Sequence, residues 1–348
     1  MGNFTFKGLF LAGLFMVLGC LSIQAADDGL ITRQVTVKVY EAGTLSEKIA
    51  YNKMYKITNL KIIGEINGTD LRVIREMGKL SVLDLSDAKI VKGGDFYYEA
   101  DLEYNGTHEY EYYYTSNDKI GDYAFDGCSG LTSLTLPSSV TEIGNWAFYG
   151  CSGLTSLTLP SGVTEIGGNA FYGCSGLTSL TLPSGVTEIG GNAFLGCSGL
   201  TSLTLPSGVT WIGDSAFWGC SGLTSLTLPS GVTWIGDYAF QYCCDLTSIY
   251  VYTEKLPYMG RDVFDGCDAK KCTVYVPKGT YDDYWISEFG YFENIVEFDP
   301  TGINNVITSN DAKELSRYSL NGQRLSAPTK GLNIVKYSDG SVKKVAIQ

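Results

Sequence analysis

The chain has 348 residues, a formal net charge of -12 and a single histidine, His108. The acidic balance argues against a nucleic-acid partner, because binding a polyphosphate relies on clustered lysine and arginine side chains. It also disfavours docking on anionic lipid, and one histidine leaves little room for histidine-based acid–base or metal chemistry.

Residues 1–25 are expected to be a secretory signal peptide. Lys7 precedes an apolar run over residues 9–21, and alanines at positions 25 and 26 offer a cleavage site. The run is too short to span a bilayer, and we expect no transmembrane span later in the chain. The stretch ending at Cys20 also loosely resembles a lipoprotein box, so a lipid anchor at Cys20 is an alternative. Either way, export to an extracellular or outer-membrane surface location is expected.

Residues 26–298 are predicted to form a solenoid, beginning with an N-terminal cap and degenerate coils over residues 26–90. Leu60-Lys61-Ile62 stands 23 residues before Leu83-Asp84-Leu85, and the same spacing recurs in the consensus copies that follow the insert. The segment over residues 35–49 is the expected lid on the first coil. Terminal units of a repeat protein depart from the consensus because one of their faces has no neighbour.

Residues 91–118 interrupt the repeat with a segment rich in tyrosine and acid. Asn105-Gly106 between alternating runs is a strong hairpin signal. A turn there pairs Glu103 with His108, which we expect to be a structural pair rather than a metal ligand or catalyst. One face of the hairpin then carries four tyrosines beside Glu99 and Asp101, namely Tyr97, Tyr110, Tyr112 and Tyr114. Rigid amphipathic rings are frequent in recognition surfaces, so these are candidate ligand-binding residues. A hairpin that merely covers the first coils is the alternative.

Residues 119–276 repeat a 23-residue unit that carries Leu-x-x-Leu-x-Leu-Pro in each consensus copy. A fixed period of this size is typical of a solenoid, in which each coil buries its apolar face against its neighbours. Alternate leucines point inward, as a strand requires, and the proline ends the strand because it lacks a donor. A second apolar wall follows, with a short helical turn expected at residues 169–172. Counting degenerate copies, we expect nine coils.

Cysteines stand at one position of successive units, and zinc sites require closer pairs than this spacing supplies. Parallel Cβ vectors keep stacked cysteines from forming relaxed bridges. We therefore expect small buried structural residues at Cys128, Cys151, Cys174, Cys197 and Cys220. Cys244 and Cys272 fall outside this row and form the one pair that we consider for a disulfide.

Four tryptophans occupy positions where the copies differ from one another, namely Trp146, Trp211, Trp218 and Trp234. Exposed aromatic rings can stack on sugars or anchor a protein interface, so these residues are further candidates for ligand binding. The alternative is drift after duplication, with the rings half-buried along the side of the solenoid.

The consensus LxxLxLPxxVxxIGxxAFxxC resembles the leucine-rich repeat of BspA-like surface proteins over roughly residues 44–298. The resemblance implies a β-rich α/β fold, a leucine-rich repeat solenoid with a parallel sheet on one face and short helical turns on another. It also implies a surface protein that adheres to extracellular matrix. The repeat specifies a scaffold rather than a ligand.

The C-terminal part is expected to comprise a cap over residues 277–298, a linker over 299–315 and a basic tail over 316–348. Three short motifs of the tail stand in the places expected of type IX secretion sorting domains, at residues 320–322, 331–334 and 343–345. This similarity implies outer-membrane export and surface attachment or release. A small β module that merely ends the chain is the alternative.

We therefore expect an adhesin that binds a protein or glycan on a host or neighbouring cell. The alternative is a structural surface spacer, or a self-associating repeat protein without a specific ligand. An enzyme is not expected, because the sequence has no GxSxG, HExxH or P-loop motif. Neither a cofactor nor a metal ion is expected.

Overall fold

The computed structural model describes residues 29–104, 107–299, 314–319, 324–325, 327–328, 330–337 and 342–347. The expected signal peptide and Cys20 lie outside the described residues. Among the helices in the described ranges, none is long and apolar enough to cross a membrane.

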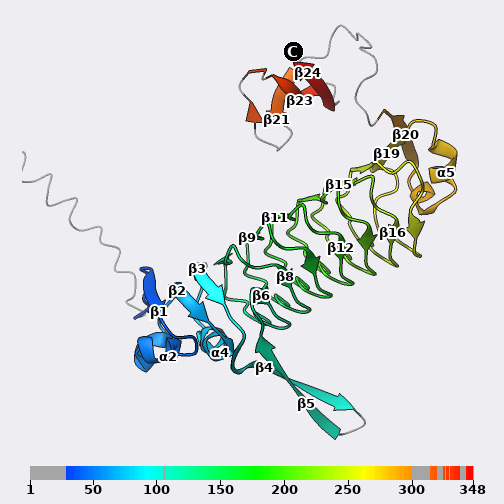
Figure 1. Ribbon diagram of the computed structural model, residues 1–348. Coiled ribbons are helices and arrows are strands. Elements are labelled where there is room, and N and C mark those ends of the chain that lie inside the picture. The colour runs from blue at the N-terminus through cyan, green and yellow to red at the C-terminus, as the bar shows by residue number, and fades with distance from the viewer. Residues whose placement is uncertain are drawn as a thin grey trace, which may run out of the picture.

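A single sheet of 11 parallel strands runs along the solenoid from end to end (Figure 1). Its consensus strands are short, because each is bounded by the loop before the second leucine and by the proline after the third. The partners keep the 23-residue spacing, so that Leu157 lies beside Leu180. In spatial order the strands are β1 (Val35–Val39), β2 (Asn59–Ile66), β3 (Val82–Ile90), β7 (Ser133–Thr135), β9 (Ser156–Thr158), β11 (Ser179–Thr181), β13 (Ser202–Thr204), β15 (Ser225–Leu228), β17 (Ser248–Val251), β19 (Thr273–Pro277) and β20 (Asn294–Phe298).

The prediction of nine coils is wrong, because the sheet gains one strand at each end. β1 pairs with β2 and β20 pairs with β19, both in parallel. Both strands lie in segments that we expected to be lids. Their sequences lack the leucine pattern because each strand has a neighbour on one side only.

A second parallel sheet of seven two-residue strands covers another side of the coils. It was not predicted, because two residues per unit are too few to show a period of two. Its strands are β6 (Lys119–Ile120), β8 (Glu142–Ile143), β10 (Glu165–Ile166), β12 (Glu188–Ile189), β14 (Trp211–Ile212), β16 (Trp234–Ile235) and β18 (Tyr258–Met259). In each strand down to β16, the isoleucine is buried and the residue before it faces outward.

The helical turn expected at residues 169–172 is not a helix. Asn169 has a φ of 57°, which a right-handed helix does not contain. The N–H groups of Asn169 and Phe171 donate to the next coil, at Gly191 and Ala193, whereas that of Tyr172 donates back to Asn169. This alternation turns the segment into a third ladder between coils.

The core between these walls is filled by leucine, isoleucine, valine and one phenylalanine per coil. The phenylalanine rings stack along the axis, with 5.1 Å between the centroids of Phe148 and Phe171. Adjacent coils approach closely where glycine removes the side chain, since a Cβ on Gly167 would lie 2.6 Å from the backbone nitrogen of Asn145. The repeat therefore specifies both a continuous apolar core and the spacing of its coils.

Short helices close the N-terminal end of the core. They are α2 (Leu45–Lys48), α3 (Tyr51–Met54) and α4 (Gly68–Glu76). Asn67 caps α4 by accepting from the backbone of Thr69, and the buried carboxylate of Asp70 accepts from the backbone of Asn67. Asp70 also accepts from the N–H of Leu45 at 2.8 Å. One carboxylate thus joins two of the capping helices.

The C-terminal end is closed by helix α5 (Tyr281–Trp285) and the 3-10 helix η1 (Glu288–Tyr291). Phe289 and Phe292 both lie 5.1 Å from the ring of Phe264, the last ring of the phenylalanine row. Buried Tyr284 donates its hydroxyl to the carbonyl of Thr253. The cap therefore continues the core with rings.

The tail contains four antiparallel strands, in the order β22-β21-β23-β24. They are β21 (Glu314–Ser319), β22 (Arg324–Leu325), β23 (Gly331–Tyr337) and β24 (Val342–Ile347). β21 begins inside the range 299–315 that we expected to be linker. The motif at residues 320–322 lies outside the described residues, whereas the other two lie in β23 and β24.

Candidate functional site

The insert forms the expected hairpin, built from β4 (Gly93–Tyr104) and β5 (Thr107–Thr115), which projects from the side of the solenoid (Figure 1). The predicted register is confirmed, with Glu99 opposite Tyr112 and Asp101 opposite Tyr110. The register shifts between Gly93 and Tyr98. This irregularity changes which side chains reach the exposed face near the base.

The base of the hairpin is fixed to the first consensus coil by a stack of rings. Tyr98 stacks on Tyr123 at 4.5 Å between ring centroids, and Tyr123 stacks on Trp146 at 5.0 Å. The guanidinium of Arg75 lies 4.9 Å from the ring centroid of Tyr98. Burial, followed by a hydrogen bond to Asp126, raises the pKa of Tyr98 to about 12. The hairpin therefore starts from a packed base.

Tyr97 was expected among the exposed tyrosines, and this expectation is wrong. Its side chain is only 3% exposed, and its hydroxyl donates to the carbonyl of Asp122 at 2.7 Å. Phe96 instead contacts Tyr112, with 4.8 Å between ring centroids. The shift of register turns Tyr97 inward, so this residue belongs to the anchor of the hairpin.

The other three tyrosines lie open to solvent on one face of the hairpin. Tyr110, Tyr112 and Tyr114 are 52%, 44% and 56% exposed. Glu99 and Asp101 lie opposite two of them, and both carboxylates are exposed. We call these five residues the tyrosine face.

His108 borders the tyrosine face and was expected to pair with Glu103. The strand register does place these two residues opposite each other. The imidazole Nδ1, however, lies 2.8 Å from a carboxylate oxygen of Asp101. Asp101 is the diagonal neighbour of His108 across the two strands and is within reach of its ring. The side chain of Glu103 lies outside the described residues, so its pairing with His108 stays a prediction.

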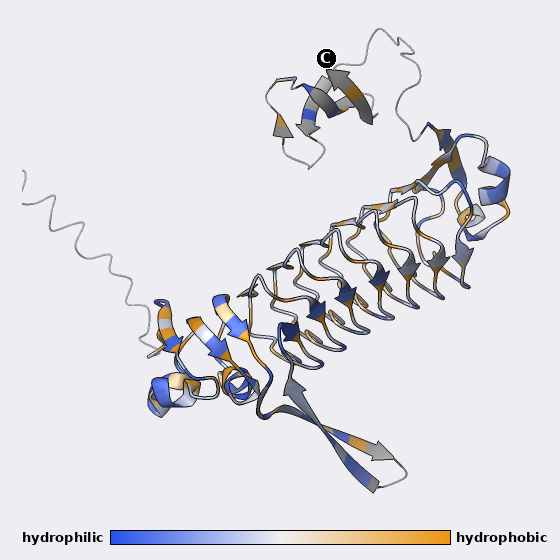
Figure 2. Ribbon diagram, in the orientation of Figure 1, coloured by the Kyte–Doolittle hydropathy of each residue, from blue (hydrophilic) through white to orange (hydrophobic). Residues whose placement is uncertain are grey.

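A second candidate surface lies on the outward row of the seven-stranded sheet. Along this row the residues change from charged to aromatic: Lys119, Glu142, Glu165, Glu188, Trp211, Trp234 and Tyr258. Figure 2 shows the change as strands that turn from deep blue to grey-blue along the solenoid. We call the last three residues the aromatic stack. Tyr258 was missed in the sequence because it follows Trp234 by 24 residues rather than 23.

The rings of the aromatic stack lie face to face. Trp211 lies 4.5 Å from Trp234 at an interplanar angle of 5°, and Trp234 lies 3.8 Å from Tyr258 at 18°. Both faces of Trp234 are therefore covered by its neighbours. Of the three rings in the aromatic stack, only Trp211 and Tyr258 are exposed. A sugar stacks on the face of a ring, and the stack instead forms an apolar ridge.

The other two candidate tryptophans are half-buried on different rows. Trp146 lies against Tyr123 at the base of the hairpin. Trp218 donates its Nε1–H to the side-chain oxygen of Gln241 at 2.7 Å and meets Tyr242 edge-on. The structure therefore does not bring the four tryptophans together into one site.

Four of the five cysteines of the repeat are fully buried, at Cys151, Cys174, Cys197 and Cys220. Each thiol donates to a phenylalanine carbonyl of the preceding coil, as Cys197 does to Phe171 at 3.1 Å. Burial raises the pKa of Cys197 to about 12. Cys244 and Cys272 are both free, the first exposed and the second buried, so the disulfide that we considered is not formed.

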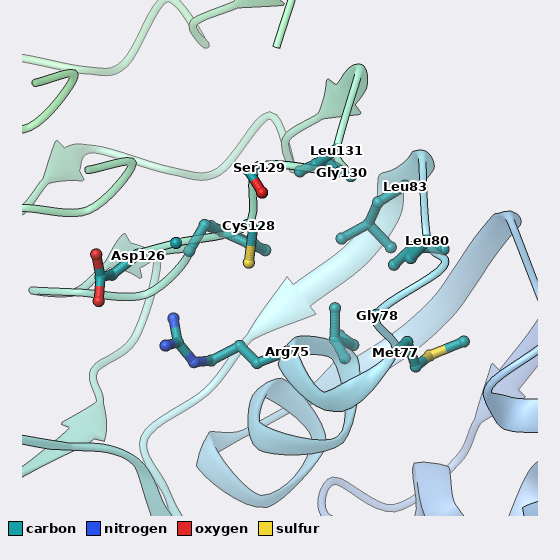
Figure 3. A pocket seen from close by; sticks show the side chains of 13 residues that line it. Arg75, Met77, Gly78, Leu80, Leu83, Asp126, Cys128, Ser129, Gly130 and Leu131 are labelled. Carbon is teal, nitrogen blue, oxygen red and sulfur yellow. The ribbon is translucent and has the colours of Figure 1, made fainter. Parts of the chain in front are cut away.

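Cys128 departs from this row, because it is partly exposed. On the side of Cys128 where a preceding consensus coil would lie, the chain has helix α4. A cavity of about 160 Å³ remains between this helix and the segment around Cys128 (Figure 3). Arg75 and Asp126 also line this cavity. The guanidinium of Arg75 is already used, since it donates to the carbonyls of Tyr123 and Ala124 at 2.6 and 3.0 Å. Within the described residues, no three His, Cys, Asp or Glu side chains are placed to hold a metal ion.

Residues 111–198 and 164–282 match the BspA type leucine-rich repeat region, in six copies. The chain belongs to the BspA-type leucine-rich repeat family. The two parallel sheets described above are built from this repeat. The β4–β5 hairpin is an insertion between two of the coils.

Solved structures of leucine-rich repeat proteins resemble the chain in part. A leucine-rich repeat protein of T. pallidum is 38% identical and covers 44% of this chain and 71% of its own, with a TM-score of 0.42. A leucine-rich repeat protein from Bacteroides ovatus is 27% identical and covers 53% of this chain and 58% of its own, with a TM-score of 0.39. A leucine-rich cell surface protein from Faecalibacterium prausnitzii is 35% identical and covers 45% of this chain and 47% of its own, with a TM-score of 0.34. No curated protein matched the sequence.

Proposed function

We propose that this BspA-type protein is a surface-displayed adhesin that binds a protein of the host extracellular matrix. The observation that carries the proposal is the tyrosine face, an exposed array of rings and carboxylates on a firmly anchored hairpin. Tyrosine rings contribute contact area at low cost in conformational entropy. Export by the signal peptide, with attachment through the tail or through a lipid at Cys20, would bring this face to the cell surface.

The chemistry of the tyrosine face favours a basic polypeptide segment. Residues 93–115 contain six acidic residues and no lysine or arginine. Glu99 and Asp101 are two residues apart on one strand, about 7 Å, and each lies opposite a tyrosine. An extended peptide with lysine or arginine at alternate positions could place each cation between a carboxylate and a ring, where both attract it.

A protein target is favoured over a glycan by the aromatic stack. Each of its rings has a face covered by a neighbouring ring, and Trp234 has both faces covered, so few ring faces are left as platforms for sugars. We also propose that the protein binds without catalysing a reaction, since Glu99 and Asp101 lie on an exposed strand face rather than in a cleft. A structural surface protein that associates with itself is the second candidate. It is favoured by the exposed rings and the opposite charges at the two ends of the solenoid.

The test is binding of the purified full chain to immobilised matrix proteins and to a glycan array. We expect saturable binding to at least one matrix protein, loss of that binding in Tyr110→Ala/Tyr112→Ala, and retention in Trp211→Ala as the matched aromatic control. The proposal fails if no matrix protein is bound saturably, or if the double variant binds as well as the parent chain.

A further inference from the structure

Among the described residues, the most exposed large hydrophobic side chains lie at the two ends of the solenoid. The three most exposed large hydrophobic side chains are Tyr40 at 85%, Ile286 at 82% and Tyr51 at 75%. Tyr40 and Tyr51 lie at the N-terminal end and Ile286 at the C-terminal end, where Figure 1 shows α2 and α5 at opposite extremities of the coils. Terminal units of a repeat protein normally carry a polar outer face, so exposed rings here require an explanation.

Each end carries its own aromatic pair. Tyr51 and Tyr55 meet edge-on at 5.4 Å between ring centroids on the N-terminal cap. Tyr281 and Trp285 stack at 6.0 Å on α5, directly before Ile286. We call Tyr40, Tyr51, Tyr55, Lys48, Lys53 and Lys56 the N-terminal end surface. The C-terminal end surface consists of Tyr281, Asp282, Asp283, Trp285 and Ile286. All of these side chains are exposed.

The two ends have opposite charge. Residues 29–57 contain five basic and two acidic residues, a net charge of +3. Residues 278–299 contain one basic and six acidic residues, a net charge of -5. The opposition falls on the end surfaces themselves, with lysines beside the tyrosines at one end and aspartates beside the tryptophan at the other.

The main sheet ends in an edge strand at each extremity, β1 and β20. Such edges present unpaired backbone groups that pair readily with another strand. Because all eleven strands are parallel, β1 of a second copy could lie beside β20 and continue the sheet without reversing its direction. The edge strands, the exposed rings and the opposite charges all meet at the same two places.

We propose that the protein associates with itself head to tail, with the N-terminal end surface of one copy against the C-terminal end surface of the next. The contact joins two different surfaces, so repeating it yields an open filament rather than a closed dimer. The occupant of each end is thus a second copy of this chain. This assembly does not depend on the adhesin proposal, because the tyrosine face projects from the side of the solenoid.

Charge reversal at one end or the other provides the test, using the full chain and sedimentation velocity over a dilution series. Lys53→Glu/Lys56→Glu changes the charge of the N-terminal end surface from +3 to -1, so that both end surfaces are acidic. Asp282→Lys/Asp283→Lys changes that of the C-terminal end surface from -2 to +2, so that both end surfaces are basic. We expect each variant alone to associate about tenfold more weakly than the parent chain or not at all. When the two variants are mixed, each acidic end meets a basic end, and association should return. Association of the parent chain should weaken as salt is added.

Two controls keep the result interpretable. Glu165→Lys/Glu188→Lys changes the net charge as Asp282→Lys/Asp283→Lys does, but on the side of the solenoid, and should leave association unchanged. Thermal unfolding of each variant should match that of the parent chain, because the substituted residues are exposed. The proposal is overturned if the parent chain remains monomeric at every concentration, if either variant alone associates like the parent, or if mixing the variants restores nothing.

Discussion

Each fully buried cysteine from 151 to 220 occupies a place where a small side chain must meet a carbonyl of the coil before it. Cys197 fills this place with its thiol 3.1 Å from the carbonyl oxygen of Phe171, without any exposed surface. Burial disfavours the thiolate, which is the reactive form. The 23-residue spacing of these cysteines therefore reflects packing, and the same argument makes Cys244, which is exposed, the chemically accessible thiol.

Thiol labelling should separate these classes. In the native protein we expect Cys244 to react rapidly with a thiol reagent and Cys128 slowly, because the latter is only partly exposed. Cys151, Cys174 and Cys220 should react only after denaturation. Mass spectrometry of labelled peptides gives the order, and rapid native labelling of any of the three buried thiols would contradict the packing assigned to them.

The buried thiols should also make stability depend on alkaline pH. Cys197 has a pKa of about 12 in the folded chain, against a reference value of 9.0. Above pH 9 the unfolded chain releases this proton while the folded chain keeps it. The free energy of unfolding therefore falls by up to about 1.4 kcal/mol per pH unit for each such thiol. The loss continues until the pH passes the folded pKa.

Urea unfolding at pH values above 9 measures this effect. Cys197→Ala should show a shallower decline with pH than the parent chain, because one of the titrating groups is gone. Tyr98, whose pKa is also raised, is present in both proteins, so its contribution cancels in the comparison. Identical slopes for the two proteins would contradict the account.

At the scale of the element, glycine determines how closely successive coils approach. A Cβ added to Gly176 would collide with the carbonyl oxygen of Ser152 in the preceding coil. At Gly162, in contrast, the nearest neighbour of an added Cβ is the carbonyl oxygen of Val140 at 3.4 Å. The same residue type therefore has different roles at the two positions.

Alanine substitution tests this difference with a matched pair. We expect Gly176→Ala to destabilise the fold by about 2 to 3 kcal/mol, because backbone must move to admit the methyl group. Gly162→Ala should change stability by less than about 1 kcal/mol, since the added methyl group would meet its neighbours at ordinary contact distance and the backbone φ is not in the left-handed region. Denaturant midpoints compare the two variants, and equal destabilisation would contradict the assignment.

The hairpin should depend on its anchor more than on its turn. Tyr98 lies between Arg75 and Tyr123, so Tyr98→Ala removes the contact that fixes the base to the first consensus coil. We expect faster hydrogen exchange in β4 and β5 for this variant, with little change in the consensus coils. Tyr112→Ala, on the exposed face, is the control. Unaltered exchange in Tyr98→Ala would show that the ring stack does not hold the hairpin.

Much of the solenoid could be predicted from its sequence because each coil repeats the same apolar positions. The strand register of the consensus coils and the buried cysteines from 151 to 220 followed from spacing, and the pairing of β4 with β5 followed from the alternation of residues around Asn105-Gly106, a pair that itself lies outside the described residues. The end strands were missed because β1 and β20 lack the leucine pattern. Tyr97 was misplaced because a shift of register near Gly93 leaves no mark in the alternation of residues. The second sheet was missed because its strands are two residues long.

For the whole molecule, position along the solenoid decides what each surface can do. The sides carry the tyrosine face and the aromatic stack, and the ends carry opposite charges. A filament of stacked coils would leave every hairpin free, so that many tyrosine faces could act together and increase avidity. Adhesion and self-association are thus compatible, although each has its own test.

The central claim is that the tyrosine face binds a basic protein segment. The direct measurement is the dissociation constant of the full chain for the matrix protein that gives the strongest saturable response, taken at increasing salt. We expect affinity to fall with salt, and Glu99→Gln/Asp101→Asn to lower it by about tenfold at low salt and to flatten the salt dependence. An affinity that depends on neither salt nor these two carboxylates would contradict the claim.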